Sequence, residues 1–185
     1  YDLERLDEIS NSFNHDLEIM IRFTPGIECH THEYIRTGSF DSKFGFGIEY
    51  LNTLFNKISN TKHLKLKGLH AHIGSQIFEL DPHKDLGEIM VKVILDAKKF
   101  GHNIEELNVG GGLGIRYTES DDPPSIDEWV KTISSSVVEA CKKNNLDFPT
   151  LMCEPGRSIV STAGITIYKI GAFKEIPGIR TYLSV

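Results

Sequence analysis

The chain contains little of what marks a disulfide-stabilised or membrane-spanning protein. Of its 185 residues three are cysteines, Cys29, Cys141 and Cys153, and none belongs to a Cys-x-x-Cys pair. This spacing argues against a disulfide framework or a structural zinc site and is typical of a reducing compartment, so we expect a cytoplasmic protein. No apolar run approaches the roughly 20 residues that a membrane helix needs, so no membrane partner is expected.

Basic residues are also in the minority. Lys and Arg number 20 against 26 Asp and Glu, which gives a formal net charge of −6, and no basic block interrupts the chain. A nucleic-acid partner is therefore not expected. The hydrophobic fraction of 39% is that of a globular chain long enough to bury a sizeable core.

Three short apolar runs recur about 40 residues apart, and each is followed by a motif of glycine, polar or charged residues that could bind a ligand. The runs cover 66–69, 107–109 and 150–153, and the motifs are His70-Ala71-His72-Ile73-Gly74-Ser75, Gly110-Gly111-Gly112 and Glu154-Pro155-Gly156-Arg157. Each gap between them holds one helical pattern. Alternating strands and helices, with the chemistry at the C-terminal end of each strand, are typical of a (β/α)8 barrel, whose loops converge on one site.

Helical periodicity predicts amphipathic helices near the start of the chain and over 51–58. A third helix is predicted to begin where Asp81 caps it and Pro82 suits its first turn, and to end before Gly101. A fourth follows a capping box of Ser125 and Glu128. The run 17–23 predicts a further strand, followed by a long loop over 27–47. The predicted buried faces are Leu86, Ile89, Met90, Val93, Ile94 and Ala97 on the third helix, and Trp129, Val130, Ile133, Val137, Ala140 and Cys141 on the fourth.

The pattern changes after Arg157. Two β-rich runs, 164–173 and 181–185, are separated by Pro177-Gly178 with no helix between them, which predicts the first strands of an antiparallel β domain. We therefore expect residues 1–163 to form the C-terminal half of a barrel and residues 164–185 a truncated β domain. Because a complete barrel takes about 250 residues, we expect an internal fragment of a longer polypeptide.

Two of the three motifs contain groups that favour the binding of an anion. The amides of Gly110, Gly111 and Gly112 are able to form a nest for a phosphate, although glycines at such a turn also serve as a tight turn alone. Arg157 is able to grip a phosphate or carboxylate with two hydrogen bonds. The alternative is a surface ion pair with Glu154 that contributes little. Since Glu154 directly follows an apolar strand, we expect it to be at least partly buried, which favours a functional role.

The histidine motif is open to two interpretations. His70 and His72 share a strand face, so they could bind a metal with Glu154 as third ligand, although the nearby Arg157 cation would compete with it. Alternatively, His72 offers a flat surface to a planar ligand while Ser75 contacts an anion. His70 itself is expected to be mostly a satisfied core residue. The His30-x-His32 pair is interpreted as surface histidines.

Taken in order, the motifs resemble those of a known family. The segments His-Ala-His-Ile-Gly-Ser-Gln at 70–76, Asn-Val-Gly-Gly-Gly-Leu-Gly at 108–114 and Glu-Pro-Gly-Arg at 154–157 closely resemble the diaminopimelate decarboxylases. These belong, with ornithine and arginine decarboxylases, to the pyridoxal-phosphate decarboxylases with an alanine-racemase-like barrel. Thr37-Gly38 and Ser42-Lys43-Phe44-Gly45 extend the match, and Gln76 with Lys43-Phe44-Gly45 favours the diaminopimelate branch.

The resemblance implies a role for each motif in binding pyridoxal 5'-phosphate. His72 would stack on the pyridine ring, and Glu154 would pair with the ring nitrogen. The phosphate would be held by Ser75, Gly110, Gly111, Gly112, Gly156 and Arg157, and Arg157 would also reach a substrate carboxylate. A carboxylate beside the ring nitrogen favours its protonated form, which makes the cofactor a stronger electron sink. No metal is implied.

The chain also departs from the family. It has no Tyr-x-x-Lys-Ala-Asn motif, so the Schiff-base lysine is expected upstream and no catalytic residue is assigned in this chain. The Cys-Glu-Ser-Gly-like segment and the tyrosine of the C-terminal β domain are missing too. The resemblance implies a homodimeric carboxy-lyase of lysine biosynthesis that converts meso-diaminopimelate to L-lysine and carbon dioxide, of which this chain alone would be inactive. The alternatives are a sister decarboxylase acting on ornithine, arginine or carboxynorspermidine, a metal-dependent barrel hydrolase, and a lysine-less regulator.

Overall fold

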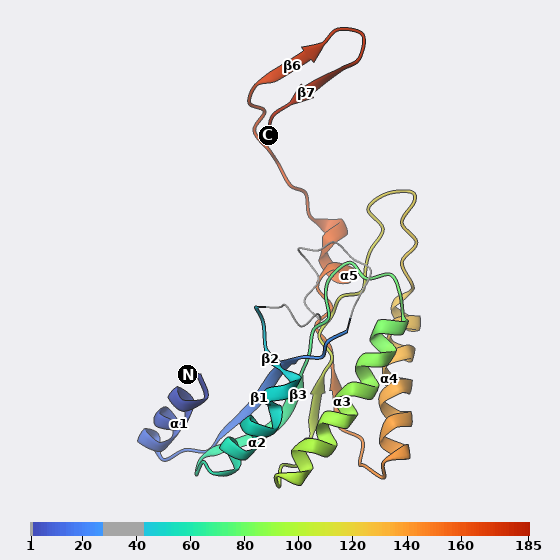
Figure 1. Cartoon of the computed structure of the whole chain (residues 1–185). Helices are drawn as coiled ribbons and strands as arrows, with labels where there is room; N and C mark the ends of the chain where they lie inside the picture. Colours follow the sequence, from blue (N-terminus) through green and yellow to red (C-terminus); the bar gives the residue numbers. More distant parts are fainter. Residues whose placement is uncertain (1, 28–42) are drawn as a thin grey trace.

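The computed structural model describes residues 2–27 and 43–185. In these residues a parallel sheet has the strand order β2–β1–β3–β4–β5 (Figure 1). Its strands are β1 (Leu17–Thr24), β2 (Phe46–Gly47), β3 (Leu64–His70), β4 (Glu106–Asn108) and β5 (Thr150–Met152). The helices are α1 (Asp2–Phe13), α2 (Leu51–Ser59), α3 (Asp81–Lys99), α4 (Ile126–Lys143) and the short α5 (Arg157–Val160), with single 3-10 turns at Ile48–Tyr50 and Ser161–Ala163. The predicted alternation of strands and helices is confirmed.

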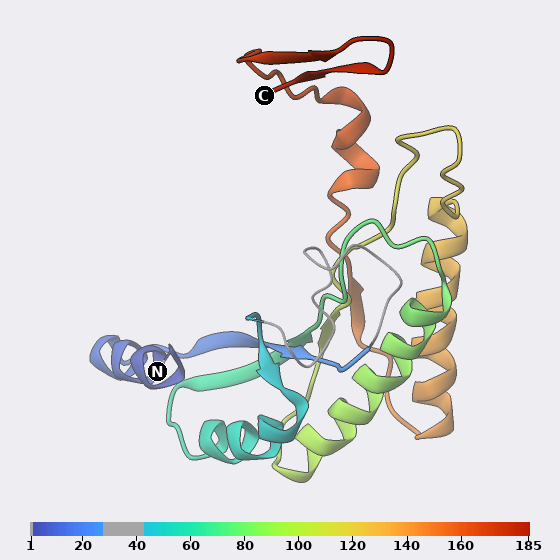
Figure 2. The same cartoon turned by 45° about the horizontal axis from the view of Figure 1, so that its top comes forward.

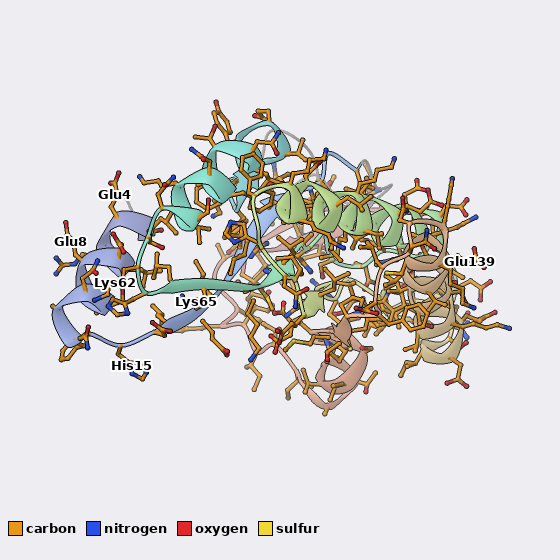
Figure 3. The ribbon with its side chains drawn as sticks, turned by 90° about the horizontal axis from the view of Figure 1, so that it is seen from below. Glu4, Glu8, His15, Lys62, Lys65 and Glu139 are labelled. Atoms are coloured by element: carbon orange, nitrogen blue, oxygen red, sulfur yellow. The ribbon has the colours of Figure 1, made fainter. Side chains whose placement is uncertain are left out.

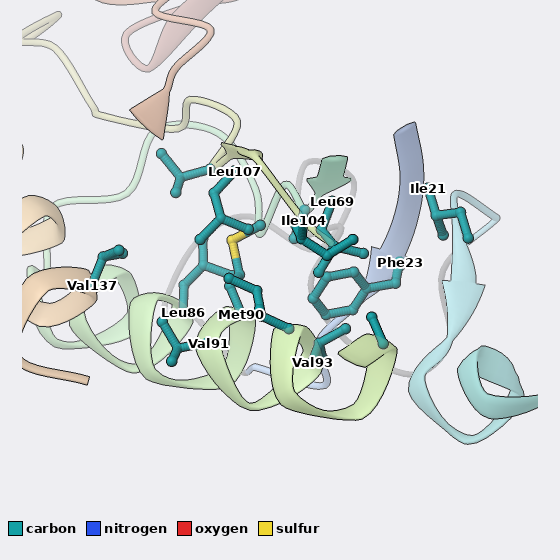
Figure 4. Close-up of a cluster of buried hydrophobic side chains, with 14 of the residues drawn as sticks. Ile21, Phe23, Leu69, Leu86, Met90, Val91, Val93, Ile104, Leu107 and Val137 are labelled. Atoms are coloured by element: carbon teal, nitrogen blue, oxygen red, sulfur yellow. The ribbon is translucent and has the colours of Figure 1, made fainter. Parts of the chain in front are cut away.

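The core lies between the sheet and the helices that follow its strands. Side chains of β1, β3 and β4, among them Phe23, Leu69 and Leu107, meet Leu86 and Met90 of α3 (Figure 4). Burial of such a side chain stabilises the fold by about 1.5–3 kcal/mol. Every predicted residue on this face of α3 is buried or packed against the core, and so are His83, Gly87 and Val91, which the pattern did not predict.

Helices α3 and α4 approach each other closely. A Cβ on Gly87 would lie 2.6 Å from the hydroxyl oxygen of Ser136, and that hydroxyl donates a hydrogen bond of 2.6 Å to the carbonyl of Lys84. The predicted face of α4 is confirmed except at Val130, which is 46% exposed. Val130 lies about 100° around the helix from Trp129, so it turns away from α3.

The helix termini are partly as predicted. Ser125 and Glu128 form the capping box in both directions, and Gly101 follows α3 with a φ of 82°. Asp81 is not the N-cap, because α3 begins at Asp81 itself and the cap position falls on Leu80, whose side chain has no acceptor. The predicted loop 27–47 also ends differently, since Phe46–Gly47 pairs with β1 as β2.

The last residues form an antiparallel hairpin that lies apart from the parallel sheet in both views (Figures 1 and 2). Its strands are β6 (Phe173–Ile176) and β7 (Arg180–Leu183), with Pro177 and Gly178 in the turn. The strand predicted over 164–173 is wrong for most of its length. Ile165 and Ile167 are 87% and 84% exposed. The β-branched residues of this segment form no strand because the described chain offers no neighbouring strand with which they could pair.

The opposite end of the sheet, where the strands begin, carries charged side chains. Figure 3 views this end and labels Lys62, just before β3, and Lys65, within it, together with Glu4 and Glu8 of α1. Lys57 of α2 donates to Glu4 of α1 at 2.5 Å in an exposed ion pair between the two helices. Among residues 2–27 and 43–185, no helix combines the length and the apolarity that crossing a bilayer requires.

Candidate functional site

The C-terminal ends of four strands bring one row of residues together. The parallel register pairs Arg22 of β1 with His70 of β3, His70 with Asn108 of β4, and Asn108 with Met152 of β5. The loops beyond these ends are joined by backbone hydrogen bonds, from Ile77 N to Gly112 O (2.9 Å) and from Glu154 N to Gly110 O (2.6 Å). The three predicted motifs therefore lie together at the C-terminal end of the sheet, as their spacing predicted.

The glycine cluster is packed against its neighbours on both sides. Gly110 and Gly112 have φ values of 68° and 110°, which L side chains rarely adopt. A Cβ would lie 2.7 Å from Ala71 O at Gly110 and 2.6 Å from Gly74 O at Gly112, and at Gly111 it would overlap the carbonyl oxygen of Glu154. The turn therefore needs glycine for its own geometry, whatever it binds.

Two of the cluster's three amides already have acceptors within the protein. Gly110 N donates to Oδ1 of Asn108 at 2.9 Å, and Gly111 N donates to Nδ1 of His72 at 3.2 Å. Within the described residues Gly112 N has no acceptor. Of the predicted nest, the Gly112 amide is thus the one that the fold leaves available to an anion.

Glu154 is held by the row beneath it. Asn108 Nδ2 donates to its Oε1 at 2.9 Å, and His70 Nε2 lies 3.4 Å from its Oε2. The expectation that Glu154 is partly buried is wrong, since its side chain is 54% exposed. It follows β5, an edge strand of the described sheet whose residues are all exposed, so no layer covers it. The ion pairs of the described chain do not include one between Glu154 and Arg157.

Both histidines of the β3 motif have a pKa below the usual value. Burial is the main cause for each, and the nearby Arg22 guanidinium lowers both further, while Glu154 acts in the opposite direction. The two rings are therefore mainly neutral at neutral pH. A neutral His72 ring suits stacking on a planar ligand. His70 is 13% exposed and touches Glu154, so it belongs to the site and is more than a core residue.

The alternative metal site of His70, His72 and Glu154 is not formed. The described part of the chain contains no group of three or more His, Cys, Asp or Glu side chains that could hold an ion. His72 Nδ1, one of its possible ligand atoms, accepts the hydrogen bond from Gly111 instead. The predictions that concern Cys29, the His30-x-His32 pair, Thr37-Gly38 and Ser42 fall outside the described residues.

Arg157 is oriented by two neighbouring loops. Its Nε donates to Ser75 Oγ and its Nη1 to the Tyr117 hydroxyl, both at 2.7 Å, and the guanidinium lies 5.8 Å from the Tyr117 ring centre. Asp121 Oδ2 anchors the Tyr117 loop by accepting from the amides of Tyr117 and Thr118, at 2.9 and 2.8 Å. A guanidinium has five N–H donors, so three have no acceptor among the described residues and could serve a ligand.

Sequence reasoning missed three residues of the site. Asn108 and Arg22 were given no role, although both lie in the row across the strand ends and Asn108 stands two residues before the predicted glycine nest. Tyr117 gave no signal, because its contact with Arg157 spans 40 positions of the sequence. The position of Gln76 is explained: it has a φ of 59° and exchanges two hydrogen bonds with the backbone of Ile115, which fastens the β3 loop to the β4 loop.

The arrangement suits a ring that carries a phosphate. A carboxylate, an available amide and a guanidinium lie on adjoining loops, and the backbone at Gly156 is open, with no described atom within 4 Å of a Cβ built there. A model of the pyridoxal-binding domain of pyridoxal-dependent decarboxylases matches residues 1–161. The chain belongs to this family. Its cofactor is pyridoxal phosphate, as the motifs implied.

Relatives of this pyridoxal-binding domain match across the whole chain. A diaminopimelate decarboxylase of Synechocystis sp. is 53% identical over 184 residues, which are 100% of this chain and 39% of the relative. One from Staphylococcus aureus is 41% identical over 185 residues, 99% of this chain and 43% of the relative. The chain thus spans about two fifths of the length of the curated relatives it matches.

Solved decarboxylases have the same fold. The diaminopimelate decarboxylase of M. jannaschii in co-complex with L-lysine superposes with a TM-score of 0.81 at 28% identity, over 98% of this chain and 42% of that one. An arginine decarboxylase of Paramecium bursaria Chlorella virus has a TM-score of 0.57 at 20% identity, over 82% of this chain and 36% of that one, and shows the fold alone. The predicted fold, part of a pyridoxal-phosphate-binding barrel followed by a small antiparallel sheet, is confirmed.

Proposed function

We propose that this chain provides much of the cofactor site of a diaminopimelate decarboxylase, which converts meso-diaminopimelate to L-lysine and carbon dioxide. The observation that carries the proposal is the 53% identity to the Synechocystis diaminopimelate decarboxylase over the whole chain. The complete protein that carries this chain is then a cytoplasmic homodimer that acts in lysine biosynthesis. The lysine that binds the cofactor covalently comes from another part of that protein, and so does the β domain of which residues 164–185 are the first strands.

The described contacts support a division of roles. Glu154, which accepts a hydrogen bond from Asn108 and lies beside His70, would pair with the ring nitrogen and favour its protonated form. The neutral ring of His72 stacks on the pyridine face. Bound pyridoxal phosphate supplies an electron sink for the electron pair that remains when carbon dioxide leaves.

Anion binding falls to the other side of the site. Gly112 N, Ser75 Oγ and the guanidinium of Arg157 bind the phosphate, and Gly156 allows the backbone to approach it. The N–H groups of Arg157 that Ser75 and Tyr117 do not use also reach a substrate carboxylate. The remaining glycines, Gly110 and Gly111, shape the loop that presents Gly112.

The test is an assay of the complete protein with pyridoxal phosphate and each of three substrates. We expect lysine and carbon dioxide from meso-diaminopimelate, and no carbon dioxide from ornithine or arginine. Turnover of ornithine or arginine without turnover of diaminopimelate would move the protein to a sister branch of the family. Cofactor binding without turnover of any of the three would favour a regulator that retains the pocket.

A further inference from the structure

We propose that Asn108 is a positioning residue that couples the carboxylate of Glu154 to the glycine loop, so that both ends of the cofactor are held by one side chain. The proposal rests on the proposed role of Glu154 at the ring nitrogen. It assigns to Asn108 the alignment of that carboxylate.

The side chain of Asn108 makes one hydrogen bond in each direction. Its Nδ2 donates to Glu154 Oε1 at 2.9 Å, and its Oδ1 accepts from Gly110 N at 2.9 Å. The orientation of the amide follows from these partners, because a reversed amide would oppose donor to donor at Gly110 and acceptor to acceptor at Glu154. Asn108 therefore has one polar arrangement that satisfies both neighbours.

Burial makes this arrangement rigid. Asn108 is 7% exposed at the end of β4, and its backbone carbonyl accepts from Ala71 N at 3.0 Å. Glu154, in contrast, is 54% exposed among the described residues, which supply it with few other contacts. The hydrogen bond on the carboxylate comes from Asn108 at Oε1, while His70 Nε2 lies 3.4 Å from Oε2 without forming one. A buried amide that cannot turn thus sets the direction of an exposed carboxylate.

The same side chain also decides which amide of the glycine loop is available. By taking the N–H of Gly110, Asn108 withdraws that donor from the site and fixes the loop that presents Gly112. A change at Asn108 should therefore disturb two functions that lie on opposite sides of the bound ring. This coupling distinguishes a positioning role from a general contribution to folding.

The experiment uses the complete protein and the Asn108→Asp substitution. Aspartate retains the acceptor for Gly110 N but replaces the donor to Glu154 with a second negative charge. Apoenzyme is titrated with pyridoxal phosphate, and the absorbance of the bound cofactor is followed against pH. We expect the Kd for the cofactor to rise about tenfold and the midpoint of the absorbance change to shift by about one pH unit. Asn103→Asp, at an exposed asparagine whose side chain makes no hydrogen bond within the described chain, is the matched control and should change neither.

A double-mutant cycle with Glu154→Gln separates the possible outcomes. If Asn108 acts through Glu154, then Asn108→Asp changes the Kd by less than about twofold in the Glu154→Gln background. An equal loss in both backgrounds would overturn the proposal, because the effect of Asn108 on the cofactor would then not pass through Glu154. If Glu154→Gln by itself leaves both the Kd and the absorbance profile unchanged, the proposed function of Glu154 fails, and the role of Asn108 fails with it.

Folding is checked by circular dichroism and thermal unfolding. If Asn108→Asp does not fold, Asn108→Ser takes its place in the same cycle, since serine removes the contact with Glu154 without adding a charge. Loss of folding in both variants would overturn the proposal, because Asn108 would then be a structural residue.

Discussion

The two glycine-containing loops that border the site differ in what surrounds them. Around Gly110, Gly111 and Gly112 the backbone of neighbouring loops is so close that no side chain fits, and two of the three residues have positive φ. Gly156 has an ordinary φ of −85°, and no described atom lies within 4 Å of a Cβ built on it. The first loop needs glycine because neighbouring backbone leaves no space for a side chain and because two of its residues have positive φ. A need for glycine at 156 has to come from a ligand or from parts of the protein beyond the described residues.

The same contrast holds for the elements behind the loops. The motif after β4 rests on Leu107 and Val109, which are 0% and 1% exposed, whereas the motif after β5 rests on Leu151 and Met152, which are 36% and 39% exposed. One side of the site is thus preorganised by a finished core. The other side offers its charged groups from an open edge, where cofactor and further chain would complete it.

The largest effect is expected where the crowding is greatest. In Gly111→Ala the new methyl group would overlap the carbonyl oxygen of Glu154, so either the glycine loop or the β5 loop has to move. We expect a loss of about 3 kcal/mol in the free energy of unfolding, measured by urea denaturation of the complete protein. Gly164→Ala is the matched control, since the nearest atoms to its Cβ are 3.9 and 4.0 Å away. Equal stability of the two variants would show that the first loop is not crowded.

On the side of the site that rests on the buried core of β4, α3 and α4, the packed side, we expect stability to depend on pH. His83 is fully buried between α3 and α4, with its ring edge-on to Trp129 at 5.6 Å between centroids. Neither ring nitrogen has a hydrogen-bond partner within residues 2–27 and 43–185. Burial, with a smaller contribution from His72, lowers its pKa from 6.5 to about 4. Between pH 6.5 and about 4, His83 is protonated in the unfolded chain but stays neutral in the folded protein, so acid favours unfolding.

We expect the free energy of unfolding to fall by about 2 kcal/mol from this group between pH 7 and pH 5. His83→Phe keeps a ring against Trp129 but cannot be protonated, so the variant should lose less stability than the parent over this interval. Urea denaturation at the two pH values measures the difference. An identical loss in both proteins would mean that His83 is hydrated or paired, and that the packed side is looser than its contacts indicate.

Much of this contrast could not be read from the sequence. Periodicity predicted the helices and the convergence of the three motifs, because apolar spacing and turn residues are local signals. The exposure of Glu154 was predicted wrongly, because it depends on whether another strand covers β5, which no local pattern records. Tyr117 and Asn108 were missed for a related reason: their partners Arg157 and Glu154 lie 40 and 46 positions away.

On the open side, Gly156→Ala should affect binding and leave stability unchanged. Its Cβ would enter empty space in the described structure, so we expect a change in unfolding free energy within about 0.5 kcal/mol. If the cofactor phosphate approaches this backbone, the Kd for pyridoxal phosphate should rise about tenfold. Cofactor titration of the apoenzyme measures this, again beside Gly164→Ala. An unchanged Kd would indicate that the phosphate does not approach Gly156. The difference in crowding between the two loops would then have no consequence for cofactor binding.

The smallest effect is expected where the two sides touch, at the hydrogen bond of 2.7 Å from Arg157 Nη1 to the Tyr117 hydroxyl. Tyr117→Phe removes the acceptor but keeps the ring near the guanidinium, so Arg157 remains in place with less restriction on its direction. Because the contact is exposed, its loss should cost little, and we expect KM for diaminopimelate to rise about threefold with kcat nearly unchanged. Tyr50→Phe, at a tyrosine that is 61% exposed, is the matched control. A fall in kcat at constant KM would place Tyr117 in the chemical step. An unchanged KM in Tyr117→Phe would show that Arg157 is aligned without help from the Tyr117 hydroxyl.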